Sequence, residues 1–148
     1  MNKLQFYSLK LIKESKAPYL TNNVINSPQD GFNFLHDIVK LHENAEEYLY
    51  MIALGTKNNI LGVAEVSHGS INSSIVTPRE VFKRALLMNA TGIIIAHNHP
   101  SGNPQPSKED IGITLRLNEC SKILGVGLLD HIIIGENRFI SLKDKGII

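Results

Sequence analysis

Residues 92–110 read GIIIAHNHPSGNPQPSKED, and this stretch decides the fold. The run from Gly92 to Ala96 is rich in β-branched residues and too short for a helix, which predicts a central strand buried on both faces. Three prolines and a glycine predict a stiff loop after it, and Ser107 predicts the start of the next helix. A strand, a loop and a helix in succession are typical of domains that combine helices with a sheet.

Helix and strand patterns alternate along the rest of the chain. Ser27 predicts a helix start that leads into an apolar stripe ending at Leu41. Thr77 predicts the start of a second helix, which ends at Met88. Apolar runs predict strands over 48–54, 60–66, 126–134 and 139–142. We therefore predict an α/β fold in which helices pack on a mixed sheet.

Length and composition predict one globular domain, because the chain has 148 residues, of which 43% are hydrophobic and 20% charged. We assign residues 28–148 to the domain and residues 1–27 to an amino-terminal extension. Fifteen Lys and Arg against fourteen Asp and Glu leave a net charge of +1, which disfavours direct nucleic-acid binding. Cys120 is the single cysteine, which excludes an internal disulfide and a thiolate-rich zinc finger. No apolar run approaches the ~20 residues that span a bilayer, so we expect a cytoplasmic protein without a membrane partner.

Two histidines and an aspartate form a candidate metal site. His97 and His99 lie two apart at the carboxyl end of the predicted strand, where both side chains point to one face about 6.5 Å apart. Asp110 follows in the first turn of the next helix. Two histidines and one carboxylate are typical of catalytic zinc, with the fourth position left to water. We therefore predict one Zn²⁺ per chain, held by His97, His99 and Asp110.

Asp110 also has a structural interpretation. The pattern Ser107-x-x-Asp110 is typical of a helix cap, in which the acid accepts a hydrogen bond from the Ser107 amide. The two roles are compatible, because Ser107 can cap the helix with one lone pair and still donate its hydroxyl to a bound substrate.

A hydrolytic zinc site also needs a general base that accepts the proton of the attacking water. Glu47 stands directly before the apolar run at 48–54, where its side chain can reach the mouth of the sheet. Glu65 lies inside the next predicted strand, where burial of an unpaired carboxylate would be costly. Spacing alone divides the role about evenly between Glu47 and Glu65, with Glu46 as a lesser third.

Asp130 and His131 are neighbours on a predicted strand, so their side chains face opposite ways. One of them could orient a metal ligand from behind. The equal alternative is an ordinary polar pair at the start of a strand.

The spacing of these residues resembles a known family. His97-x-His99, seven residues, Ser107, two residues and Asp110 is identical to the JAMM metalloprotease motif of JAB/MPN domains. The longer string HNHPSG at 97–102, with PS at 106–107, PRE at 78–80 and LDH at 129–131, resembles the RadC-like branch, whose members carry a DNA-repair label. The resemblance covers about residues 27–148.

The resemblance implies a three-layer α-β-α sandwich similar to cytidine deaminases, with zinc on the His-His-Asp set. It also implies a catalytic glutamate directly ahead of an aromatic and apolar strand, which favours Glu47. Asn98 stands where many JAB domains have Ser or Thr, which disfavours ubiquitin-type specificity. Full-length RadC-like proteins usually carry an amino-terminal helix-hairpin-helix region, for which the first 27 residues are too short.

We therefore expect a JAMM-type zinc metallohydrolase that cleaves peptide or isopeptide bonds of a peptide or protein substrate, in a DNA-repair context. Glu47 and Ser107 are its expected catalytic residues. The alternative is a zinc-stabilised interaction module without enzymatic activity, in DNA repair or mobile-element biology. A zinc deaminase is disfavoured, because its signature needs a Pro-Cys-x-x-Cys pair. The sequence leaves the substrate and the oligomeric state open.

Overall fold

The computed structural model describes residues 5, 8, 10, 12, 23–69 and 76–148. Most of the amino-terminal extension falls outside these residues. At the end of the extension, Val24 forms an isolated antiparallel bridge with Asn59, and Ile25 is buried in the core.

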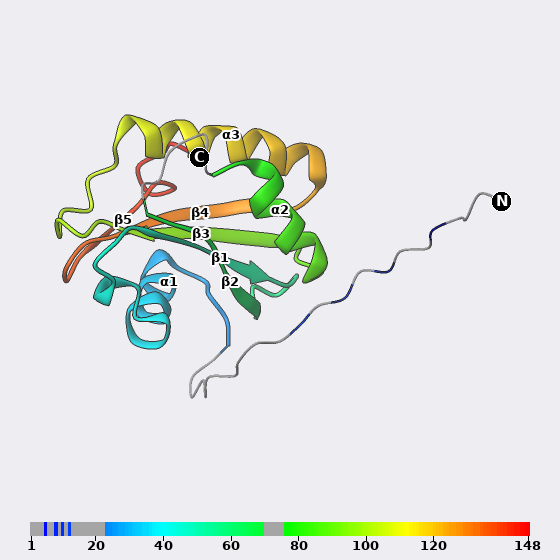
Figure 1. Cartoon of the computed structure of the whole chain (residues 1–148), viewed down its shortest axis with the longest axis horizontal. Coiled ribbons are helices and arrows are strands. Elements are labelled where there is room, and N and C mark those ends of the chain that lie inside the picture. Colours follow the sequence, from blue (N-terminus) through cyan, green and yellow to red (C-terminus); the bar gives the residue numbers. More distant parts are fainter. Residues whose placement is uncertain (1–4, 6–7, 9, 11, 13–22, 70–75) are drawn as a thin grey trace.

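A five-stranded mixed sheet forms the middle of the molecule (Figure 1), with the strand order β2-β1-β3-β4-β5. The strands are β1 (Tyr48–Leu54), β2 (Ile60–His68), β3 (Gly92–Asn98), β4 (Gly127–Ile134) and β5 (Phe139–Ser141). β3 is the central strand, antiparallel to β1 and parallel to β4. Every residue of β3 is buried, as its β-branched composition predicts.

Helices cover both faces of the sheet, so the mixed α/β prediction is confirmed. α1 (Pro28–Phe34) packs on one face, while α2 (Pro78–Leu87) and α3 (Lys108–Leu124) pack on the other (Figure 1). The three helices begin at the residues that the capping patterns predict. The side chains of Ser27, Thr77 and Ser107 each accept a hydrogen bond from a backbone N–H of the first turn.

The first helix is shorter than its apolar stripe predicts. After α1 the chain winds into a π-helical turn at Leu35–Val39, and Lys40 then adopts a left-handed conformation with φ of 55°. A short 3₁₀ turn, Leu41–Glu43, follows. Because a left-handed residue ends a helix, Leu41 reaches the core from a separate turn.

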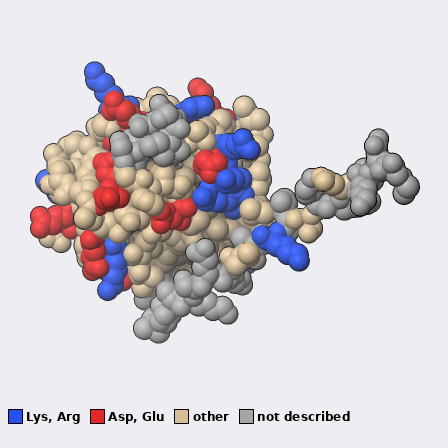
Figure 2. All heavy atoms as spheres, in the orientation of Figure 1, with Lys and Arg blue, Asp and Glu red and all other residues tan. Residues whose placement is uncertain are grey.

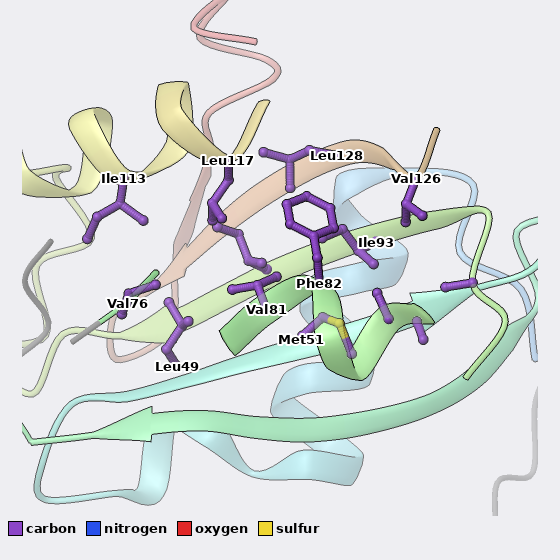
Figure 3. Close-up of a cluster of buried hydrophobic side chains, with 14 residues drawn as sticks. Leu49, Met51, Val76, Val81, Phe82, Ile93, Ile113, Leu117, Val126 and Leu128 are labelled. Atoms are coloured by element: carbon purple, nitrogen blue, oxygen red, sulfur yellow. The ribbon is translucent and has the colours of Figure 1, made fainter. Parts of the chain in front are cut away.

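Alternation along β3 divides the core into two halves. Ile93 and Ile95 join the cluster under α2 and α3, which Figure 3 shows, whereas Ile94 and Ala96 join the cluster under α1. We call these the α2–α3 face and the α1 face. Since side chains alternate along a strand, His97 points to the α2–α3 face and Asn98 to the α1 face.

Charges of both signs share the surface drawn in Figure 2, in keeping with the net charge of +1. Within the described part of the chain, no helix combines the length and the apolar character needed to cross a membrane.

Candidate metal centre

The end of β3 and the first turn of α3 bring three side chains together. His97 Nε2 lies 2.9 Å from His99 Nε2 and 3.2 Å from Asp110 Oδ1. His99 Nε2 lies 3.4 Å from Asp110 Oδ2. These three residues are the only group of three or more metal-binding side chains with converging ligand atoms among the residues that the structure describes. The structure thus gathers the three residues that the spacing predicts.

Asp110 serves the helix and the cluster at once. Its backbone N–H donates to Ser107 Oγ at 3.1 Å, and its Oδ2 accepts from the Ser107 N–H at 2.7 Å. Its Oδ1 faces His97. The capping interpretation is therefore confirmed, and the same carboxylate also lies where a metal ligand would have to lie. Burial works to raise the pKa of Asp110, but the contacts with His97 and His99 outweigh it and hold that pKa well below its usual range.

The loop after β3 fixes the orientation of His99. His99 Nδ1 lies 2.8 Å from the carbonyl oxygen of Asn103, which can only accept, so Nδ1 carries the proton and donates. The backbone N–H of His99 donates to Ile134 O at 2.8 Å. Gly135 lets the next turn approach, because a Cβ there would collide with the Gly102 carbonyl. No signal in the sequence marks this close approach, because it joins two segments that are distant in the chain.

A buried relay fixes the proton of His97. Thr114 Oγ1 donates its single hydrogen to the Asp110 carbonyl at 2.6 Å, so it accepts from His131 Nδ1 at 2.6 Å. Burial lowers the pKa of His131 well below its usual range, so the ring is neutral and its Nε2 is an acceptor. His97 Nδ1 therefore donates to His131 Nε2 at 2.8 Å, which leaves His97 Nε2 with its lone pair.

The proton positions on His97 and His99 bear on whether the cluster can hold a cation. In the neutral imidazoles, both Nε2 atoms carry lone pairs, and they face each other and the Asp110 carboxylate. Three electron-pair donors this close repel one another unless a proton or a cation lies between them. The contact with Asp110 raises the pKa of His99, so a proton is favoured between these two groups when no cation lies there, in keeping with the lowered pKa of Asp110. Two nitrogens and one carboxylate fit a divalent cation such as zinc.

The register of the sheet separates the candidate bases. Leu49 pairs with His97 and lies on the α2–α3 face, so Glu47, two residues earlier, lies toward that same face at the level of His99. After Asp110, the charge of Glu47 is a further contributor to the raised pKa of His99. Glu65 pairs with Tyr50 and lies toward the α1 face.

Glu65 differs from its expected environment. Its side chain is 41% exposed and lies 2.6 Å from His68 Nδ1, so it is neither buried nor unpaired. The expectation of a costly burial is wrong, because β2 is the edge strand of the sheet. Glu46 is exposed as well, and its carbonyl oxygen accepts a hydrogen bond from Asn98.

The side chains of Asp130 and His131 point to opposite faces of the sheet, as those of neighbours on a strand do. His131 turns to the α2–α3 face and contacts the candidate metal ligand His97. Asp130 turns away and accepts hydrogen bonds from Ser141 Oγ and from the amide of Lys143. Of the two, His131 is thus the one placed to orient His97 from behind.

Thr114→Val should weaken metal binding by up to about 10-fold, the lower end of the usual effect of removing a partner of a metal ligand, because Thr114 acts on His97 through His131. Valine keeps the shape but leaves His131 Nδ1 without an acceptor, so the proton of His97 is no longer fixed. Isothermal titration with zinc measures the affinity. Thr91→Val, which removes the Thr91 hydroxyl at the far end of β3, is the control and should bind zinc normally. Equal affinity in both variants would contradict the relay.

A mixed sheet between helical layers, with a His-His-Asp cluster at the carboxyl end of its central strand, defines a domain of the JAB/MPN class. The family model described as the RadC-like JAB domain matches residues 25–147, and the chain belongs to this family. The resemblance found in the motifs is thereby confirmed.

Several bacterial proteins are similar to most of this chain. A UPF0758 protein of Clostridium beijerinckii is 51% identical over 141 residues, which make up 94% of this chain and 61% of the relative. A UPF0758 protein of Clostridium botulinum is 61% identical over 124 residues, or 84% of this chain and 53% of the relative. The chain thus spans about three fifths or less of the length of these relatives. Their names state no activity.

Proposed function

We propose that this chain is a zinc-dependent metallohydrolase of the JAMM type that cleaves peptide or isopeptide bonds. The observation that carries the proposal is the convergence of His97 Nε2, His99 Nε2 and the Asp110 carboxylate, which lie 2.9–3.4 Å from one another. Such an arrangement supports a cation held by three protein ligands, with one tetrahedral position left for water. Bound zinc would supply Lewis-acid chemistry, because it lowers the pKa of a coordinated water towards about 7 and polarises a carbonyl oxygen.

The protein side of the reaction rests on Glu47 and Ser107. Glu47 accepts the proton that the attacking water loses and passes it to the leaving amine. Ser107 Oγ already accepts the Asp110 N–H, and its own hydrogen is not used in that bond. The hydroxyl, at the positive end of α3, donates to the oxygen that becomes negative in the transition state.

The substrate that we propose is a peptide or protein, with no direct contact to nucleic acid from this chain. The net charge of +1 supports the second part, because binding to a phosphate backbone needs many unpaired cations. The DNA-repair context is proposed on the resemblance to the RadC-like branch alone.

Metal removal tests the proposal. Zinc-loaded protein should hydrolyse members of a peptide library that includes isopeptide-linked pairs. Chelation should stop turnover, and added zinc should restore it. His99→Ala, analysed for metal beside the wild type, should contain no zinc and show no hydrolysis. Zinc-loaded protein that is folded but cleaves nothing in the library would favour the interaction module instead.

A further inference from the structure

Asn98 stands between the two histidine ligands but points the other way. It is 2% exposed and lies on the α1 face of the sheet, opposite His97. Its side-chain hydrogen bonds all go to the backbone of residues 44–48. A buried amide that spends all of its bonds on one short segment has a specific effect on that segment.

The side chain of Asn98 forms hydrogen bonds with the backbone directly before and directly after Glu47. Asn98 Oδ1 accepts from the Tyr48 N–H at 2.8 Å, and Asn98 Nδ2 donates to the Glu46 carbonyl at 2.9 Å. A second hydrogen of Nδ2 reaches the Asn44 carbonyl at 3.2 Å. The atoms directly before and after Glu47 are therefore held by one side chain.

On the β3 side this contact takes the place of sheet pairing, while on the β2 side the Glu47 carbonyl accepts the Gly69 N–H at 2.8 Å. The pairing of β1 with β3 begins at Leu49 and His97, so the backbone of Glu47 lies beyond that ladder. Asn98 belongs to the same tripeptide as the ligands His97 and His99, so it ties the segment to the frame that carries them. A serine or threonine hydroxyl has one hydrogen and a shorter reach, so it cannot make the same set of bonds.

We propose that Asn98 is a positioning residue that sets the distance between the Glu47 carboxylate and the metal ligands. The role of Glu47 in proton transfer rests on the proposed function, but its placement by Asn98 does not. A displacement of about 1 Å at a catalytic group can lower turnover by about 10²-fold. Asn98→Ser should therefore lower kcat by about 10²-fold, with KM and zinc content unchanged.

The closing experiment uses the full chain and reads the position of Glu47 without turnover. Protein with ¹³C-labelled glutamate carboxyl groups is titrated with zinc, and the Glu47 signal is assigned by its loss in Glu47→Gln. Zinc should shift this signal in the wild type and not in Asn98→Ser. Asn98→Asp, which keeps the acceptor for Tyr48 but loses both donors, is the second variant and should show a reduced shift.

A matched control separates positioning from general loosening. Ser141→Ala removes another buried hydrogen bond, the one to Asp130, and touches nothing in residues 44–48. It should keep the zinc-induced shift and normal turnover. A full shift in Asn98→Ser, or its loss in Ser141→Ala, would overturn the proposal. A further drop in kcat when Asn98→Ser is added to Glu47→Gln would do so too.

The two proposals fail in different ways. If no peptide is cleaved by the wild type, the proposed function fails, and the zinc-induced shift still decides whether Asn98 positions Glu47. If peptides are cleaved and Asn98→Ser behaves as the wild type in both measurements, the inference about Asn98 fails alone.

Discussion

Glu47→Gln should reduce peptide hydrolysis by about 10²- to 10⁴-fold, the usual contribution of a general base, while zinc stays bound. Glutamine has the size of glutamate but cannot accept a proton, and residue 47 is not among the converging ligand groups. Turnover is measured on the peptide that the wild type cleaves best, and zinc content is measured by metal analysis on the same sample.

Glu65→Gln is the matched control for this change. It makes the same chemical substitution on the adjacent strand, but toward the α1 face, where Glu65 pairs with the exposed His68. We expect turnover close to that of the wild type. Full activity in Glu47→Gln, or a comparable loss in Glu65→Gln, would remove Glu47 from the mechanism.

Asp110→Asn should abolish stable zinc binding while α3 stays capped. The amide oxygen of asparagine can still accept the Ser107 N–H, so the helix start survives. The neutral amide offers the cation no negative charge, and we expect an affinity at least about 100-fold lower, beyond the usual effect of losing a partner of a ligand. Zinc titration gives the affinity, and circular dichroism gives the helix content.

Ser107→Ala tests the opposite case, in which the cap of α3 is weakened and the metal ligands are kept. It removes the hydroxyl that caps α3, which should lower the free energy of unfolding by about 1 kcal/mol, but it leaves the three ligands in place. Zinc should therefore remain bound in Ser107→Ala at reduced thermal stability. If Asp110→Asn binds zinc as tightly as the wild type, Asp110 acts only as a cap.

The convergence of His97, His99 and Asp110 could be predicted because it depends on local geometry. His97 and His99 share a face through the two-residue period of a strand, and Asp110 occupies a helix start that Ser107 marks. The central position of β3 follows from its β-branched run. In each case the deciding residues lie within the single stretch 92–110, where the effect of the backbone can be followed along the chain.

The supporting contacts could not be predicted, because they join distant parts of the chain. His131 and His97 are 34 residues apart, and Asn98 reaches across 50 residues to Tyr48. The exposure of Glu65 could not be predicted for a related reason. A single apolar run does not reveal whether its strand will lie at the edge of the sheet or in the middle.

The alternation of side chains at 97–99 also constrains how this chain can change length. A one-residue insertion within β3 would turn the side chain of Asn98 toward Asp110. It would turn the imidazoles of His97 and His99 toward the apolar layer beneath α1. Insertions or deletions of two residues within β3 would leave each side chain on its present face of the sheet. The loop at 100–106 is constrained in another way, because Asn103 holds the ring of His99 and Gly102 packs against Gly135, so its length should be kept as well.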